Sequence, residues 1–178
     1  MNRRWKIIIG LASLLALAAG SYVWSATDGE EGMAKMTATV RRKFPRVPQL
    51  PTAELAAWLA DKGRPQPQLL DVREPDEHAV SHLHGALQVS PGTPASAVLT
   101  KIDPARPVVV YCSVGYRSSA LAQRLIDAGA KDVRNLEGSI FAWANEGRPL
   151  EKDGRPVKTV HPYNGVFGRL LKPECRAK

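Results

Sequence analysis

The stretch that most constrains the fold is a short apolar run that ends in a cysteine and leads into a helical pattern. Residues 108–111 read Val-Val-Val-Tyr and are followed directly by Cys112. β-branched and aromatic residues without a polar interruption predict a strand buried on both faces. Apolar residues then repeat at helical spacing over residues 121–126, until Gly129 ends the pattern. The sequence therefore predicts a thiol at the carboxyl end of a central strand, where open α/β sheets bind their ligands.

The residues between this strand and this helix indicate a reactive thiol. A cysteine attacks as its thiolate, and a helix N-terminus or a nearby cation lowers the thiol pKa. We predict that Ser118 or Ser119 caps the helix and that Gly115 permits a tight turn aiming backbone N–H groups at the sulfur. Arg117 can donate to an oxyanion or to a carboxylate that braces the loop. No histidine lies between Cys112 and the helix, so the sequence favours activation by the local field over a Cys–His pair.

Each cysteine also has a plainer interpretation. A lone cysteine after three valines is commonly a buried hydrophobic residue, but the glycine and arginine that follow Cys112 favour a nucleophile. Cys175, the second cysteine, lies near the C-terminus and is either an incidental thiol or a resolving thiol for Cys112. The two cysteines and four histidines show no zinc-ligand spacing, so no metal site is predicted.

Residues 47–150 alternate between strand-like and helix-like segments joined by short connections. This alternation predicts an α/β fold with a mostly parallel central sheet covered by helices on both faces. A unit of this length can bury one hydrophobic core. Strands are expected at 68–73, 86–89, 108–111 and 132–136, and helices after residues 51, 75, 95, 117 and 138.

The N-terminal segment, residues 1–27, is expected to be a membrane anchor or a signal peptide. Three basic residues precede 7–24, an uncharged stretch of eighteen residues. Trp5 and Trp24 suit the two membrane interfaces, and their separation spans roughly 28 Å as a helix. We favour a single-pass transmembrane helix with the domain on the extracytoplasmic side. The alternative is a secreted or periplasmic protein after signal cleavage, and the basic group 41–43 argues against the favoured orientation.

The net charge of +8 resides in the flanks of this chain. Residues 47–150 carry ten basic and eleven acidic side chains, whereas a nucleic-acid reader concentrates basic residues on its folded core. We therefore expect no nucleic-acid partner. Residues 28–46 show no convincing apolar period and are expected to be a tether, and residues 151–178 to be a basic, extended tail. The sequence makes no prediction about the oligomeric state.

Four segments resemble the rhodanese family of sulfurtransferases. Residues 112–118, Cys-Ser-Val-Gly-Tyr-Arg-Ser, resemble the active-site loop of that family. Residues 70–77 are similar to its "DVREPEE" segment and residues 81–86 to its "GHIPGA" segment. Residues 135–138, with Trp143, resemble its "LEGG…W" ending. The resemblance covers residues 47–150 in the family order and identifies a rhodanese-like, single-domain sulfurtransferase.

The resemblance implies that Cys112 takes the outer sulfur of thiosulfate or a related donor, releases sulfite, and passes the sulfur from a persulfide to cyanide or a thiol. No cofactor is implied. Four residues separate Cys112 from Arg117, whereas related phosphatase and arsenate-reductase loops have five. The implied substrate-binding residues are Ser113, Val114, Gly115, Tyr116 and Arg117, and the implied supporting residues are Asp71, Arg73 and Ser118.

Departures from the family pattern leave alternatives open. Ser113 stands where active members often carry arginine or lysine, so the resemblance implies weaker thiosulfate binding and another physiological donor. His84 replaces a proline, and Ser139 replaces the second glycine. The alternatives are a non-catalytic, membrane-tethered binding module and a redox role that pairs Cys112 with Cys175.

Overall fold

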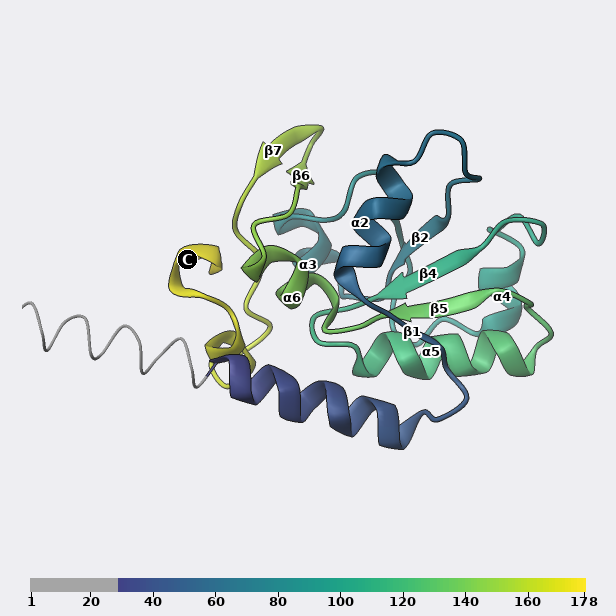
Figure 1. Ribbon diagram of the computed structural model, residues 1–178, viewed down its shortest axis with the longest axis horizontal. Helices are drawn as coiled ribbons and strands as arrows, with labels where there is room; N and C mark the ends of the chain where they lie inside the picture. Colours follow the sequence, from purple (N-terminus) through teal and green to yellow (C-terminus); the bar gives the residue numbers. More distant parts are fainter. Residues whose placement is uncertain (1–28) are drawn as a thin grey trace, which may run out of the picture.

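The computed structural model describes residues 29–178 and places a parallel sheet at their centre (Figure 1). This sheet has five strands in the order β1-β5-β4-β2-β3, and every neighbouring pair is parallel. The mostly parallel sheet predicted from the alternating pattern is confirmed, although β1 was not anticipated. The strands are β1 (Gln49–Leu50), β2 (Gln68–Asp71), β3 (Leu87–Gln88), β4 (Val108–Tyr111) and β5 (Val133–Leu136).

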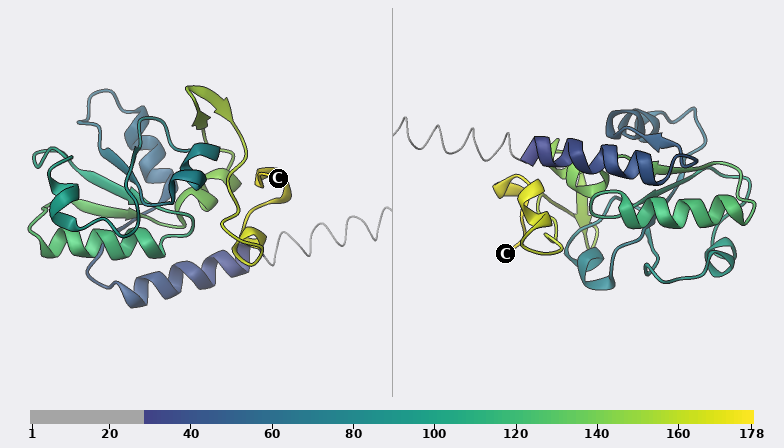
Figure 2. Two further views of the ribbon diagram at one scale, coloured as in Figure 1. Left: turned by 180° about the vertical axis from the view of Figure 1, so that it is seen from behind. Right: turned by 90° about the horizontal axis from the view of Figure 1, so that it is seen from below.

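Helices cover both faces of this sheet because buried side chains alternate along its strands (Figures 1 and 2). Val109 and Tyr111 pack with α2 and α6 on one face, whereas Val108 and Val110 pack with α4 and α5 on the other. β4 is buried at all four positions and is the centre of both packing layers. The helices are α2 (Thr52–Ala60), α3 (Pro75–Val80), α4 (Ala95–Leu99), α5 (Tyr116–Asp127) and α6 (Ser139–Asn145).

The start of α5 differs from the prediction of a serine cap. The residue that caps the helix is Gly115, with φ of 103°, and no side chain caps it. A left-handed conformation at this position suits glycine and lets the chain enter the helix directly at Tyr116. Ser118 and Ser119 consequently lie inside the first turn, where both are buried. The prediction that either serine caps α5 was wrong.

The segment expected to be a tether contains a helix over residues 29–43. Met33 and Met36 pack against the core of the domain, and Val40 is buried. Arg41 donates from Nη2 to Oε2 of Glu137 at 2.8 Å. The spacing of the three apolar residues is helical, but only alanines, threonines and one lysine lie between them, so the apolar stripe is narrow. This flank is therefore packed onto the domain and differs from the predicted tether.

The segment expected to be an extended tail is also folded. Three of its apolar side chains are buried at separate points along the segment. Val160, Leu171 and Cys175 belong to the core cluster that contains α6. Because they follow no period, sequence patterns do not reveal their burial. The elements are the antiparallel hairpin β6 (Leu150–Lys152) and β7 (Arg155–Val157), and the 3₁₀ turns η1 (Phe167–Leu170) and η2 (Pro173–Cys175).

The two flanks meet beside the domain. The start of the helix over residues 29–43 lies next to η1 in all the views (Figures 1 and 2). A methyl group added at Gly32 would lie 2.7 Å from Cδ2 of Leu170. The Leu170 side chain would have to shift to accommodate a side chain at position 32, so the two flanks are in close contact here.

The expected membrane segment, residues 1–27, lies outside the described residues. Within residues 29–178, no helix is long and apolar enough to cross a membrane. The anchor and the membrane orientation stay predictions from the sequence.

Candidate active site

Cys112 lies at the carboxyl end of β4, inside a loop that closes around its sulfur. The residue exposes 1% of its surface. Its Sγ accepts a hydrogen bond from the backbone N–H of Gly115 at 3.2 Å and contacts Oγ of Ser118 at 3.4 Å. Gly115 makes this closure possible, because a side chain there would be strained by the φ of 103° and would lie 3.3 Å from Nδ2 of Asn135.

The surroundings of the thiol favour its negatively charged form. Burial raises the pKa of Cys112, but the Ser118 hydroxyl, the positive charge of Arg117 and the N–H groups of Ser118 and Gly115 together outweigh it. The pKa of the Cys112 thiol is therefore lowered from its ordinary value. This is the property required of a nucleophilic cysteine at neutral pH.

Ser118 connects the sulfur to an amide on the neighbouring strand. Its Oγ donates to Oδ1 of Asn135 at 2.6 Å, and Nδ2 of Asn135 donates to Oε1 of Gln49 at 2.7 Å. A hydroxyl has one proton, so Ser118 can donate either to Asn135 or to the sulfur of Cys112 at one time. The hydroxyl can therefore turn toward a thiolate as negative charge appears on the sulfur.

The first turn of α6 holds the backbone of the loop. The N–H groups of Ile140 and Phe141 donate to the carbonyls of Cys112 and Ser113, both at 3.1 Å. The N–H of Cys112 donates to Oγ of Ser139, also at 3.1 Å. N–H groups at a helix start have no partner within the helix, and here they fix the position of the loop. Ser139 adopts φ of 52°, a left-handed conformation at the position where the family pattern has glycine.

Arg117 forms a two-pronged ion pair with Glu77 of α3. Its Nη1 and Nη2 lie 2.7 and 2.9 Å from the two carboxylate oxygens of Glu77. Ser113 donates from Oγ to Oε1 of Glu77 at 2.8 Å and accepts from Nη2 of Arg117 at 2.9 Å. Burial raises the pKa of Glu77, but Arg117, the N–H of Glu74 and Ser113 lower it by more than burial raises it. The net pKa is lowered, so the carboxylate stays charged. Arg117 therefore braces the loop through a carboxylate, one of its two predicted roles.

A second, fully buried ion pair positions α3 itself. Nε of Arg73 donates to Oδ1 of Asp71 at 2.8 Å, and both side chains are completely buried. Arg73 also donates from Nη1 to the carbonyl of Glu77 at 3.1 Å and from Nη2 to that of Ser81 at 2.6 Å. Burial raises the pKa of Asp71, but the hydrogen bonds from His78 and Arg73 outweigh it and lower that pKa. The pair holds the helix that carries Glu77.

The remaining predicted loop residues point in different directions. Val114 is buried, whereas Tyr116 is exposed and packs edge to face on Phe44, with ring centroids 5.2 Å apart. Phe44 follows the N-terminal helix and packs against the core cluster on the α5 face. Tyr116 is therefore held by a residue from outside the predicted domain.

Three residues that contact the Cys112 loop, Glu77, Asn135 and Ser139, were not predicted from the sequence as site residues. Glu77 completes a capping box at the start of α3, a pattern visible in the sequence but readily assigned to helix capping alone. Asn135 is a fully buried amide within β5, and a polar residue in a buried strand is the signal that could have identified it. Within residues 29–178, no cluster of histidine, cysteine and carboxylate side chains could hold a metal ion.

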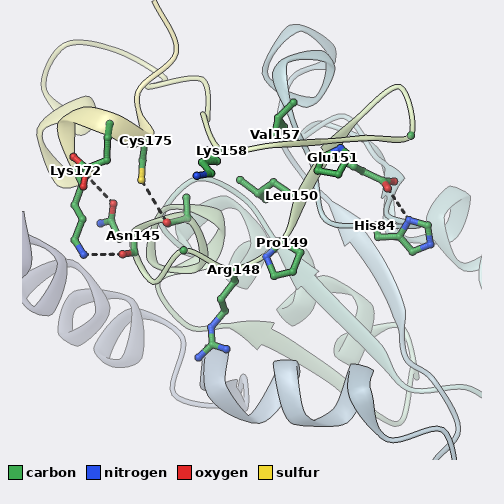
Figure 3. Close-up of a pocket in the computed structure, with 15 residues that line it drawn as sticks. His84, Asn145, Arg148, Pro149, Leu150, Glu151, Val157, Lys158, Lys172 and Cys175 are labelled. Carbon is green, nitrogen blue, oxygen red and sulfur yellow. Dashed lines mark hydrogen bonds and ion pairs between the residues drawn. The ribbon is translucent and has the colours of Figure 1, made fainter.

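Cys175 lies elsewhere, beside a pocket of about 680 Å³ between the end of α6, the β6–β7 hairpin and η2 (Figure 3). Its Sγ donates to the carbonyl of Ala144 at 3.4 Å, and burial raises the pKa of its thiol. Cys112 and Cys175 are both free and belong to different core clusters. The structure thus does not bring the two thiols together as a resolving pair would require.

The fold and the site together define a parallel α/β protein with an activated cysteine in a strand-to-helix loop. A family model, described as "Rhodanese-like domain", matches residues 52–146. The chain belongs to this family of sulfurtransferases. The family expected from the four sequence segments is confirmed.

Curated relatives share about half of the chain. The probable adenylyltransferase/sulfurtransferase MoeZ of Mycobacterium tuberculosis is 37% identical over 97 residues, which cover 54% of this chain and 24% of MoeZ. The thiosulfate sulfurtransferase GlpE of Coxiella burnetii is 34% identical over 91 residues, which cover 51% of this chain and 83% of GlpE. The chain therefore spans a quarter of the first relative and most of the second.

Solved structures show the same fold. A rhodanese-like domain protein from Staphylococcus aureus is 26% identical and superimposes with a TM-score of 0.52, covering 61% of this chain and all of that chain. The BH2092 protein from Bacillus halodurans is 18% identical with a TM-score of 0.59, covering 75% of this chain and 96% of that chain. At that identity the second match is evidence for the fold alone.

Proposed function

We propose that this protein transfers a sulfane sulfur as a persulfide on Cys112. The observation that carries the proposal is the geometry around the Cys112 sulfur, which accepts a hydrogen bond from the N–H of Gly115 and contacts the Ser118 hydroxyl. These groups and the charge of Arg117 lower the pKa of the thiol. Membership of a sulfurtransferase family and the similarity to GlpE, named as a thiosulfate sulfurtransferase, support it.

The proposed reaction has two balanced steps. The Cys112 thiolate attacks the outer sulfur of a donor such as thiosulfate; the donor S–S bond breaks, and sulfite leaves with the bonding electron pair. The acceptor, cyanide or a thiolate, then attacks the outer sulfur of the persulfide and releases the Cys112 thiolate. Charge on the sulfur is stabilised in both steps by Gly115 N–H and the Ser118 hydroxyl, as in an oxyanion hole.

The low net positive charge around Ser113 and Arg117 affects which sulfur donor the site favours. Ser113 exposes 3% of its surface, and its hydroxyl is engaged by Glu77 and Arg117. Glu77 also forms an ion pair with Arg117, the cation whose charge lowers the pKa of Cys112. A site with so little net positive charge favours a small donor of low charge over dianionic thiosulfate.

The test is intact-mass measurement of the full chain after incubation with thiosulfate or with cysteine persulfide, a donor of lower charge. We expect a mass increase of one sulfur atom, located on Cys112 and removed by cyanide. Cys112→Ser should abolish the adduct, while Cys175→Ser, the matched control, should retain it. If no donor adds sulfur to Cys112, the proposal fails and the alternative of a non-catalytic binding module gains support.

A further inference from the structure

The C-terminal segment beyond the family match reaches the side chain that acts on the thiol. The match ends at residue 146, and Tyr163 follows seventeen positions later. The guanidinium carbon of Arg117 lies 4.8 Å from the centre of the Tyr163 ring. A cation over the face of an aromatic ring is attracted by the electrons of that ring. A residue from outside the family domain thus contacts the active-site arginine.

Local hydrogen bonds and an uncommon backbone conformation fix the position of the Tyr163 ring. Tyr163 adopts φ of 63°, a conformation that non-glycine residues rarely take, and its N–H donates to Nδ1 of His161 at 3.0 Å. Asn164 accepts at Oδ1 from the N–H groups of Val166 and Phe167, at 3.0 and 2.9 Å. The Phe167 ring packs edge to face on Tyr163, with centroids 5.5 Å apart. Such a conformation persists only where its surroundings hold it.

Arg117 is consequently held on two sides. Its nitrogen atoms are engaged by Glu77 and Ser113, while one face of the guanidinium lies against the Tyr163 ring. The positive charge of Arg117 in α5 acts on the Cys112 sulfur. Glu77 of α3 pairs with that arginine and so acts on the sulfur indirectly. The position of the Arg117 guanidinium therefore contributes to the electrostatic field at the sulfur.

We propose that Tyr163 is a positioning residue of the active site, whose ring holds the Arg117 guanidinium against Glu77 and Ser113 and so keeps a cation beside Cys112. This proposal deepens the proposed function and rests on it for its consequence in sulfur transfer. The C-terminal segment is then part of the site, and the family domain over residues 52–146 is incomplete without it.

The test measures the pH dependence of Cys112 alkylation by iodoacetamide in the full chain, read by peptide mass. Tyr163→Asn removes the ring and keeps a residue that tolerates the left-handed conformation. Tyr163→Phe keeps the ring. Val166→Ala, at a side chain 72% exposed in the same segment, is the matched control.

We expect Tyr163→Asn to shift the Cys112 profile to higher pH and to lower its alkylation at neutral pH about two- to fivefold, as expected for a cation–π contact. Tyr163→Phe and Val166→Ala should follow the wild type. An unshifted profile in Tyr163→Asn would overturn the proposal, as would an equal shift in Val166→Ala. Alkylation needs no sulfur donor, so failure of the proposed function would appear separately, as an absent persulfide with the shift intact.

Discussion

The two cysteines of this chain are both buried and free, yet their surroundings give them opposite chemistry. Cys112 exposes 1% of its surface and Cys175 exposes 7%. Burial raises the pKa of both thiols. At Cys112 the Ser118 hydroxyl, the charge of Arg117 and two N–H groups outweigh burial, so the pKa is lowered. At Cys175 the negative charge of Glu174 adds to the effect of burial, so the pKa is raised. Burial alone does not make a thiol inert. Its reactivity depends on whether the groups around the sulfur stabilise negative charge.

The Cys112 loop and the Cys175 turn also differ in the contacts that hold them in place. The Cys112 loop depends on charged side chains from a distant helix, because Glu77 binds both Arg117 and Ser113. The Cys175 turn is held by backbone hydrogen bonds, such as the one from the N–H of Val160 to the carbonyl of Cys175 at 2.8 Å, and by Lys172 and Arg176, whose side chains donate to backbone carbonyls. Substitutions in the charged network should therefore affect one thiol and spare the other.

The largest effect should come from Glu77→Gln, which removes the carboxylate shared by Arg117 and Ser113. We expect the free energy of unfolding to fall by about 1–3 kcal/mol at neutral pH, between the values for exposed and buried ion pairs. Urea unfolding measures it. Glu54→Gln, at an exposed position on α2, is the control. Alkylation of Cys175 in the folded protein should not change.

The pH dependence of this difference has a definite sign. Because the folded-state pKa of Glu77 is lowered, its stabilising contribution is present above the unfolded-state pKa and is lost as pH falls through the folded-state pKa. The difference in the free energy of unfolding between the wild type and Glu77→Gln should become smaller in acid. A gap that is constant with pH would show that the carboxylate charge is not what stabilises the loop.

A smaller effect is expected from Ser118→Ala, which removes the hydroxyl beside the Cys112 sulfur. The pKa of Cys112 should rise, because a hydrogen bond to the charged form of the thiol is lost. Thiolate absorbance during a pH titration of the Cys175→Ser background measures this shift. Ser119→Ala, at the next buried serine of α5, is the control, since Ser119 Oγ has no hydrogen-bond partner within the described residues. Equal shifts in both variants would contradict the role given to Ser118.

The smallest effect should follow Cys175→Ser, which we expect to leave the alkylation of Cys112 unchanged. In the wild type, iodoacetamide should label Cys112 at lower pH than Cys175, because the lowered pKa keeps the Cys112 thiolate populated there. Peptide mass mapping across pH resolves the two. Alkylation of Cys175 at lower pH than Cys112 would contradict the lowered pKa of Cys112 and the raised pKa of Cys175.

Local patterns predicted the central part of the fold because its information lies within a few adjacent residues. The apolar run 108–111, Cys112 and the helical spacing that follows are contiguous, so strand, loop and helix could be assigned in order. The helix cap was misplaced, because Gly115, predicted to permit a tight turn, also starts the helix, so the two serines lie inside its first turn. The folding of the flanks was not predicted either, because their sparse apolar residues are buried only by packing onto the core clusters of the domain.

By itself, the sequence determined the parallel α/β unit, its family and the candidate nucleophile Cys112. The tertiary structure alone decided what surrounds that sulfur and the arginine beside it. Glu77 lies 40 positions before Arg117 in the sequence, and Asn135 lies 17 positions after Ser118. The physical reason is that the carboxyl ends of parallel strands meet at one edge of the sheet, so the loops after β2, β4 and β5 converge there. Tyr163 reaches the same edge because the C-terminal segment folds back beside it.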